Sequence, residues 1–275
     1  MTFLKKLHIH PLFLLLIVLS LFTGTFVQLF ILFAIILIHE IGHYTLANHY
    51  QWHIQSIVLW VFGGVMKTTE ATNRPIKEDI IVTVAGPLQH IWMFAVIYGC
   101  SYIDIIPTSL VQTAFYFNWL LLLFNLLPIY PLDGGKLLFY ILSLFLPYKK
   151  AHQYTYRFSL LACILLVLFL FFNPFTLTAV LLLLFLMWEN YQQWRQHPYI
   201  FMRFLLQRMK MPEIEILFVD HSYTLMDVFS LFKRTREHEI KLKESTYSLS
   251  ETEALDYYFN KGKIQESVGQ IIKVI

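Results

Sequence analysis

Residues 10 to 194 consist largely of apolar segments, and a helix needs roughly 20 residues to cross a bilayer. Turn residues or charges separate six such segments: 10–22, 26–47, 80–103, 110–127 with a continuation beyond a break to 147, 157–173 and 175–194. Hydrophobic residues make up 57% of the 275 residues and charged residues only 14%, and the mean hydropathy is +0.57. This composition predicts a polytopic membrane protein and excludes an ordinary soluble core.

Positive charges alternate between the two sides of the predicted membrane domain. Apart from Lys136 in the fourth segment, they precede the first segment, lie between the second and third and between the fourth and fifth, and follow the sixth: Lys5, Lys6, Lys67, Arg74, Lys77, Lys149, Lys150, Arg157 and Arg195 onward. Because Lys and Arg stay on the cytoplasmic side, this pattern predicts six spans with both termini in the cytoplasm. The first segment has no small-residue cleavage site after it, so we expect a retained span rather than a signal peptide.

Charged residues are concentrated in the last part of the chain, which predicts a separate domain there. We expect a six-span membrane domain over 1–195, a linker over 196–215 and a small cytoplasmic domain over 216–275. Cys100 and Cys163 lie far apart in apolar runs, so neither a disulfide nor a thiolate metal cluster is expected. The net charge is +3 without a dense basic run, so no direct nucleic-acid partner is expected.

The second predicted span carries the sequence HEIGH at residues 39–43. His39 and His43 lie about 40° apart on one helix face, so both imidazoles can reach one ion. Glu40 points to the side of that pair, as in the H-E-x-x-H pattern whose glutamate acts as general base toward water at a zinc ion. Charged groups are costly within a membrane and are normally functional there. His39 is eight residues from position 47, about 12 Å by helix rise, which places the chemistry near the cytoplasmic face.

The fourth segment contains a predicted helix break that could supply a third ligand. Pro128 and Pro131 remove backbone donors, and two glycines follow Asp133. Irregular backbone at membrane depth requires protein or a water-filled cavity to satisfy it, so the break indicates a site. Asp133 is the expected ligand, although it could also cap the following helix. Asn125 could make an interhelical contact or bind the backbone of a peptide substrate.

Seven further histidines lie at predicted span ends or in loops, where we expect interfacial side chains: His8, His10, His49, His53, His90, His152 and His197. Residues 52–68 contain strand-forming residues and an alternating stretch that ends at Gly63 and Gly64. They predict a membrane-associated β-hairpin, which could offer an edge to an unwound substrate or only seal the cavity. The expected fold is therefore an all-α polytopic membrane protein of six transmembrane helices with this hairpin and a small C-terminal domain.

HEIGH in one span, together with NLLPIYPLDGG at residues 125–135, resembles the site-2 protease family of intramembrane metalloproteases. VFGGVM at 61–66 and the run from Asn73 to Trp92 extend this resemblance to the compact sporulation branch of the family. Residues 219–242 are similar to one half of a CBS motif, which makes the C-terminal domain α/β in class. No PDZ insertion is visible, and the resemblance covers most of the chain.

The resemblance implies a zinc metalloendopeptidase. It makes His39, His43 and Asp133 the zinc ligands and Glu40 the catalytic base, and it places Asn125 and Pro131 near the substrate. It also implies the membrane-associated pro-sigma-K precursor as substrate, inhibitory sporulation membrane proteins as partners, and the outer membrane around the forespore as location. ATP is the expected ligand of the CBS-like domain. A lone CBS half leaves one face of this domain unfilled, so we expect it to pair with a second copy in a homo-oligomer.

Two other function classes fit some of these residues. A metal transporter or proton-coupled carrier would also place His, Glu and Asp at a broken helix, but such carriers usually contain two matching broken helices. Only the fourth segment is broken here. A binding protein without catalysis would not require Glu40, because zinc ligation does not use it. The protease is therefore the favoured interpretation.

Overall fold

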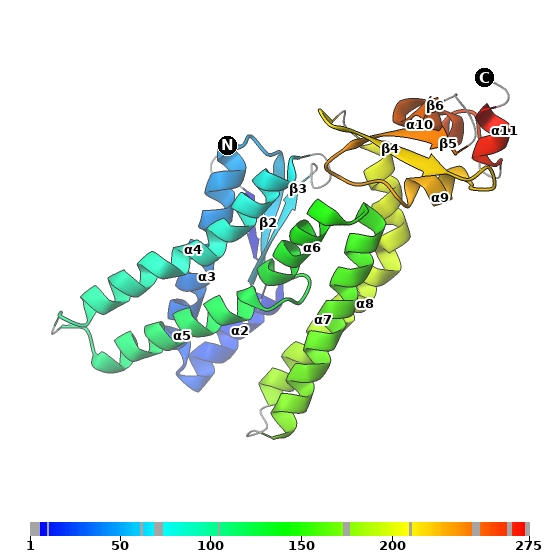
Figure 1. The fold of residues 1–275 in the computed structure, drawn as a ribbon. Helices are drawn as coiled ribbons and strands as arrows, with labels where there is room; N and C mark the ends of the chain where they lie inside the picture. Colours follow the sequence, from blue (N-terminus) through cyan, green and yellow to red (C-terminus); the bar gives the residue numbers. More distant parts are fainter. Residues whose placement is uncertain are drawn as a thin grey trace. The chain divides into compact units, whose positions relative to one another are not determined.

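The computed structural model describes residues 6–9, 11–60, 63–68, 74–103, 105–172, 177–208, 211–243, 248–262 and 266–272. The chain forms two compact units: Met1–Pro128 with Leu132–Leu137, and Ile129–Pro131 with Leu138–Ile275. The first unit contains β1 (Leu7–Ile9), α2 (Pro11–Thr23), α3 (Phe26–His49), β2 (Ile54–Trp60), β3 (Gly63–Thr68), α4 (Ile76–Cys100) and α5 (Thr108–Leu126) (Figure 1). The helix α6 (Asp133–Phe145) begins in this unit and continues into the second.

Within the described part of the chain, four helices are long and apolar enough to cross a membrane: Phe26–His49, Ile76–Cys100, Thr108–Leu126 and Tyr148–Leu170. Large apolar side chains on these helices and on α2 remain exposed, among them Leu14, Phe30, Ile91, Leu123 and Phe169. Exposed apolar surface of this extent is typical of a lipid-facing protein. The expectation of a mostly helical membrane protein with a small sheet is thus confirmed. The first and sixth predicted spans correspond to the short helix α2 and to α8 (Leu177–Leu206), which carries several charges.

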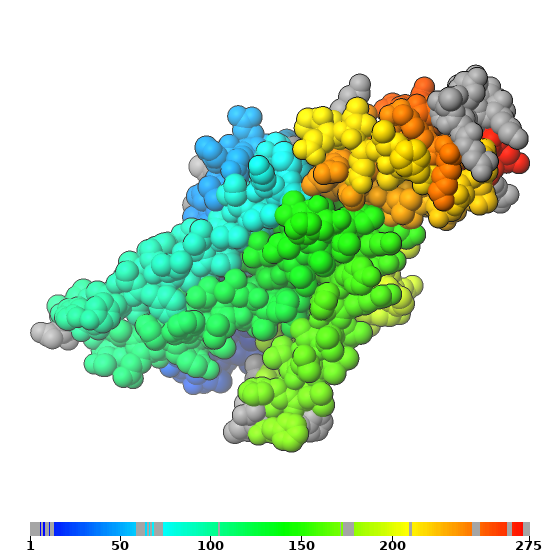
Figure 2. Space-filling model, in the orientation of Figure 1, coloured from blue at the N-terminus to red at the C-terminus, as the bar shows by residue number. Residues whose placement is uncertain are grey.

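The helices α3, α4 and α5 pack on one another and form the frame of the first unit. In the space-filling view the surfaces of α4 and α5 adjoin (Figure 2). Gly24 joins α2 to α3 with a φ of 72°, a conformation that glycine adopts without a Cβ penalty. Ile35, Ile36, Met93 and Leu121 form the buried apolar cluster between these helices. This cluster holds α3 in contact with both of its neighbours.

The predicted hairpin is present as part of a three-stranded sheet of order β1-β2-β3. β1 is parallel to β2, and β2 is antiparallel to β3, with Trp60 opposite Gly63. Ile54 and Ile57 are buried on β2 and pack against Ala47 of α3 and Val82 of α4. The sheet is therefore fixed to α3, which carries the HEIGH sequence, and to α4. β3 is its edge strand among the described residues.

The second unit contains α7 (Tyr148–Phe171), α8, β4 (Ile214–Val219), α9 (Leu225–Phe229), β5 (Glu237–Leu242), β6 (Ser248–Ser250), α10 (Glu251–Phe259) and α11 (Val268–Ile272). β4 and β5 are parallel, and β6 is antiparallel to β5. One apolar cluster includes Tyr148 of α7, Phe204 of α8 and Phe232 beside the sheet. Residues 196–206, the first part of the segment predicted to be a linker, lie in α8, and Phe201, Phe204 and Leu205 pack into this cluster.

Candidate active site

The HEIGH residues lie within α3, and three of their side chains are buried: His39 at 4%, Glu40 at 5% and His43 at 7% exposure. A close approach of α4 creates the space for the rings. A Cβ placed on Gly86 would lie 2.2 Å from Nε2 of His43 and 2.7 Å from Cε1 of His39. Only a residue without a side chain fits between the two helices at this point.

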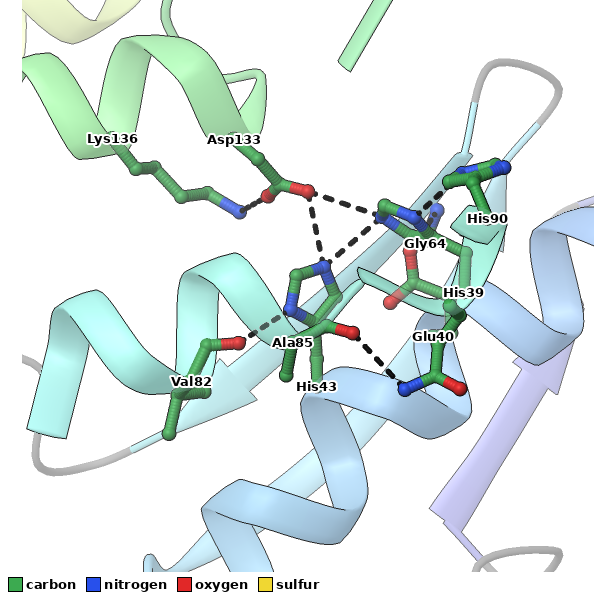
Figure 3. A network of polar contacts seen from close by, with 10 residues as sticks. His39, Glu40, His43, Gly64, Val82, Ala85, His90, Asp133 and Lys136 are labelled. Carbon is green, nitrogen blue, oxygen red and sulfur yellow. Dashed lines mark hydrogen bonds and ion pairs between the residues drawn. The ribbon is translucent and has the colours of Figure 1, made fainter. Parts of the chain in front are cut away.

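A tight turn brings Asp133 to the histidines. α5 ends at Leu126, and Asp133 is the first residue of α6. A Cβ on Gly134 would lie 2.2 Å from the carbonyl oxygen of Leu126, so the chain folds back against the end of α5 where a side chain would collide. The Asp133 carboxylate is consequently buried and faces α3 (Figure 3).

Three ligand-type atoms meet at nearly equal distances. Oδ2 of Asp133 is 3.1 Å from Nε2 of His39 and 3.1 Å from Nε2 of His43, and the two nitrogens are 3.1 Å apart. Two imidazoles and one carboxylate are a common ligand set of catalytic zinc. A tetrahedral zinc with bonds of about 2.0 Å has ligand atoms about 3.3 Å apart, so the triangle fits this ion.

The second oxygen of Asp133 binds a lysine. Nζ of Lys136 is 3.2 Å from Oδ1, whereas Oδ2 faces the histidines (Figure 3). Lys136 is one turn further along α6, which brings its side chain back to the start of the helix. This contact directs a single carboxylate oxygen toward the histidines, as monodentate ligation requires.

The edge strand contacts the expected catalytic base. The backbone N–H of Gly64 donates to Oε1 of Glu40 at 3.0 Å. A Cβ on Gly64 would lie 2.2 Å from Cδ of Glu40, so the strand can approach the carboxylate only because this residue is glycine. Gly64 therefore orients Glu40, a role that the sequence did not indicate.

Two buried residues next to the histidines were not expected at the site. Nε2 of His90 is 3.1 Å from Nδ1 of His39, and Nδ1 of His90 is 2.7 Å from Oδ1 of Asn118. Both residues are fully buried, His90 on α4 and Asn118 on α5. The expectation of an interfacial His90 was wrong, because this residue lies in the middle of its helix. The sequence signal that could have indicated a buried His90 is its position inside the predicted span 80–103.

The remaining histidines and expected substrate residues are placed as follows. His152 and His197 are also buried within helices rather than interfacial, whereas His8, His49 and His53 are exposed, and His10 lies outside the described residues. Asn125 is in the last turn of α5 and half-buried. Pro131 follows a cis peptide bond two residues before Asp133, and Gly63 begins β3.

The chain is similar to several known proteins. Peptidase family M50 matches residues 27–105 and 94–168. The chain is 38% identical to Stage IV sporulation protein FB of Bacillus subtilis over 97% of this chain and 96% of that protein. It is 30% identical to a zinc metalloprotease of Methanocaldococcus jannaschii over 50% of this chain and 41% of the relative. The solved Site-2 Protease from Methanocaldococcus jannaschii is similar in fold, with a TM-score of 0.55, 27% identity and coverage of 68% of this chain and 89% of that one.

Proposed function

Because the chain belongs to peptidase family M50 and is an intramembrane zinc metalloprotease, we propose that His39, His43 and Asp133 hold its zinc and that Glu40 is the general base. The resemblance to the site-2 protease family seen in the sequence is thereby confirmed. The observation that supports these roles is the triangle of ligand atoms with sides of 3.1 Å. Glu40 lies beside this triangle without forming part of it.

The reaction is hydrolysis of a peptide bond by general acid–base catalysis. When bound, zinc supplies Lewis acidity, which acidifies water and polarises the scissile carbonyl. Oε1 of Glu40 accepts the Gly64 N–H, so Oε2 is the oxygen that takes the proton from the attacking water. Glu40 then returns this proton to the leaving amine nitrogen. No covalent intermediate with the protein is required.

A helical substrate hides its carbonyl groups in hydrogen bonds and must be unwound before cleavage. We assign the replacement hydrogen bonds to the edge of β3 at Gly63 and Gly64, which adds the substrate as a further strand. The position of β3 at the edge of the described sheet supports this assignment. Asn125 and Pro131 flank the same turn as Asp133 and are assigned to substrate binding by family resemblance.

The proposed substrate is pro-sigma-K, whose pro-sequence would be removed near the cytoplasmic face. The name of the Bacillus subtilis relative supports a role in sporulation. Inhibitory sporulation membrane proteins would hold the enzyme silent in the outer membrane around the forespore. These partners follow from the resemblance to the sporulation branch of the family.

The architecture proposed for the membrane has six spans and two cytoplasmic termini. The four long apolar helices support the central part of this topology, and α2 and α8 would provide the other two spans. Residues 216–275 would form a CBS-like domain that binds ATP and pairs with a second copy. The parallel pair β4 and β5, joined through α9, supports a CBS-like arrangement.

The test is cleavage of co-expressed pro-sigma-K by wild type and by Glu40→Gln, with zinc measured in both purified proteins. We expect the variant to lose cleavage and to keep about one zinc per chain. Glu189→Gln, which changes a glutamate of α8, is the matched control and should cleave normally. Normal cleavage by Glu40→Gln, or a wild type without zinc, would contradict the proposed mechanism.

A further inference from the structure

One connected set of hydrogen bonds runs from the proposed metal site through three helices. It starts at Nδ1 of His39 on α3, passes through His90 on α4 and ends at Asn118 on α5. Asn118 also donates from Nδ2 to the backbone carbonyl of His90 at 3.1 Å. His90 and Asn118 both have 0% exposure, so water does not compete for these bonds.

The backbone carbonyl of His90, which accepts a hydrogen bond from Asn118, determines the direction of every hydrogen bond in this set. A carbonyl can only accept, so the Asn118 amide presents its NH₂ group there and its Oδ1 to His90. Oδ1 has no hydrogen, so Nδ1 of His90 carries the proton and Nε2 of the neutral ring accepts. Nδ1 of His39 must then be the donor, which leaves the lone pair of its Nε2 directed at Asp133 and His43.

His43 receives equivalent support from the backbone, because its Nδ1 lies 2.8 Å from the carbonyl oxygen of Val82. Nδ1 of His39 instead contacts the side chain of His90, and an imidazole can accept or donate at either nitrogen. A proton on Nε2 of His90 would force the proton of His39 onto Nε2, the atom that faces the ion. A second group is therefore needed to fix the tautomer of His90, and Asn118 is positioned to do so.

We propose that His90 and Asn118 are positioning residues that hold His39 in the tautomer able to bind zinc. This inference rests on the proposed ligand set of His39, His43 and Asp133. Groups that orient a metal-bound histidine are typically worth about 10–100-fold in metal affinity or activity. The same loss is expected here when His90 can no longer accept a hydrogen bond.

The test compares His90→Leu with His90→Gln in the full chain purified in detergent. Gln places an amide oxygen near the position of Nε2 and an amide NH₂ toward Asn118, whereas Leu fills the volume without accepting. Zinc affinity, measured by competition with a chromophoric chelator, should fall about 10–100-fold in His90→Leu and recover in His90→Gln. A purely packing role predicts the reverse order, because Leu suits a buried site better than Gln does.

Two controls keep the outcomes distinct. Met93→Ala opens a cavity one turn further along α4, where Met93 is 3% exposed, and should lower stability without changing zinc affinity. Asp133→Ala should abolish zinc binding, and its failure to do so would contradict the proposed ligand set itself. Zinc loss in Asp133→Ala with wild-type affinity in His90→Leu would overturn only the positioning role. If His90→Leu does not fold, Asn118→Leu tests the same orientation with both rings in place.

Discussion

At the scale of residues, the site depends on glycines as much as on its polar side chains. Gly86 makes room for the two imidazoles, and Gly64 brings a backbone N–H to the carboxylate of Glu40, the proposed general base. Neither position offers a side chain to the chemistry. Their importance follows from the distances at which a Cβ would meet His43 and Glu40, both 2.2 Å for the nearest atom.

Gly64→Ala should therefore reduce cleavage without removing zinc. The added methyl group collides with Glu40 alone among its nearest neighbours, so the carboxylate must move while the proposed ligands stay in place. Misplacement by about 1 Å can cost about 100-fold in rate, and we expect a loss of that order. Cleavage rate and zinc content are measured together. Gly99→Ala is the control, because nothing lies within 4 Å of a Cβ there, and equal activity of the two variants would refute the argument.

At the scale of elements, the irregular segment Ile129–Pro131 is held by the helices α7 and α8, which belong to the same unit. The N–H of Tyr130 donates to Oγ of Ser159 on α7 at 2.9 Å, and Nδ2 of Asn190 on α8 donates to the Tyr130 carbonyl. Backbone groups outside regular structure need such partners in a membrane. The segment that precedes Asp133 is thus held by hydrogen bonds and does not depend on helix geometry.

Ser159→Ala should lower the free energy of unfolding by about 1–3 kcal/mol, because it removes the acceptor of a backbone N–H. Ser143→Ala is the matched control: Ser143 is equally buried but donates to the Phe139 carbonyl within its own helix. The Phe139 carbonyl lies within a helix, where the backbone can still bond it, so Ser143→Ala should lower the free energy of unfolding by less than Ser159→Ala does. The free energies of unfolding of the two variants are compared in detergent, with heat or denaturant used to unfold the protein. Equal stability of the two variants would show that Ser159 is not needed.

At the scale of the whole molecule, the C-terminal sheet shares one core with the helices of the second unit. Tyr148 stacks on Phe204 at 3.9 Å between ring centroids and donates its N–H to the Phe232 carbonyl at 2.9 Å. A buried group joins the end of α8 to the sheet: Arg208 and His238 both bind the carboxylate of Glu251. Arg208 follows α8, His238 lies on β5 and Glu251 begins α10.

Glu251 should make the stability of this unit depend on pH. Burial alone would raise the pKa of Glu251, but hydrogen bonds from His238 and Arg208 lower it below its usual value. Its contribution is therefore present above the unfolded pKa of about 4.3 and is lost as the pH falls through the lower folded pKa. Glu251→Gln should cost about 3–5 kcal/mol at neutral pH, because Arg208 stays buried without its partner.

The measurement is the thermal unfolding midpoint of the full chain in detergent over a series of pH values. The unfolding midpoint of wild type should fall in the acid range. In Glu251→Gln it should fall less there, because this variant already lacks the contribution of the ionised carboxylate. Glu237→Gln, next to His238 on β5, is the control, because the buried hydrogen bonds to Arg208 and His238 are made by the carboxylate of Glu251. An unchanged pH profile in Glu251→Gln would contradict this role.

The sequence by itself determined the features that depend on local periodicity. Helix geometry places His39 and His43 on one face, apolar length predicts a membrane protein, and two prolines before Asp133 predict the break. The tertiary structure decided what meets these residues: His90, Asn118 and Gly64 come from other elements, at separations of 51, 28 and 24 residues along the chain from the residues they contact. Which face of α4 or edge of β3 meets the site depends on the rotation and packing of whole elements. No local pattern in this sequence specifies that packing.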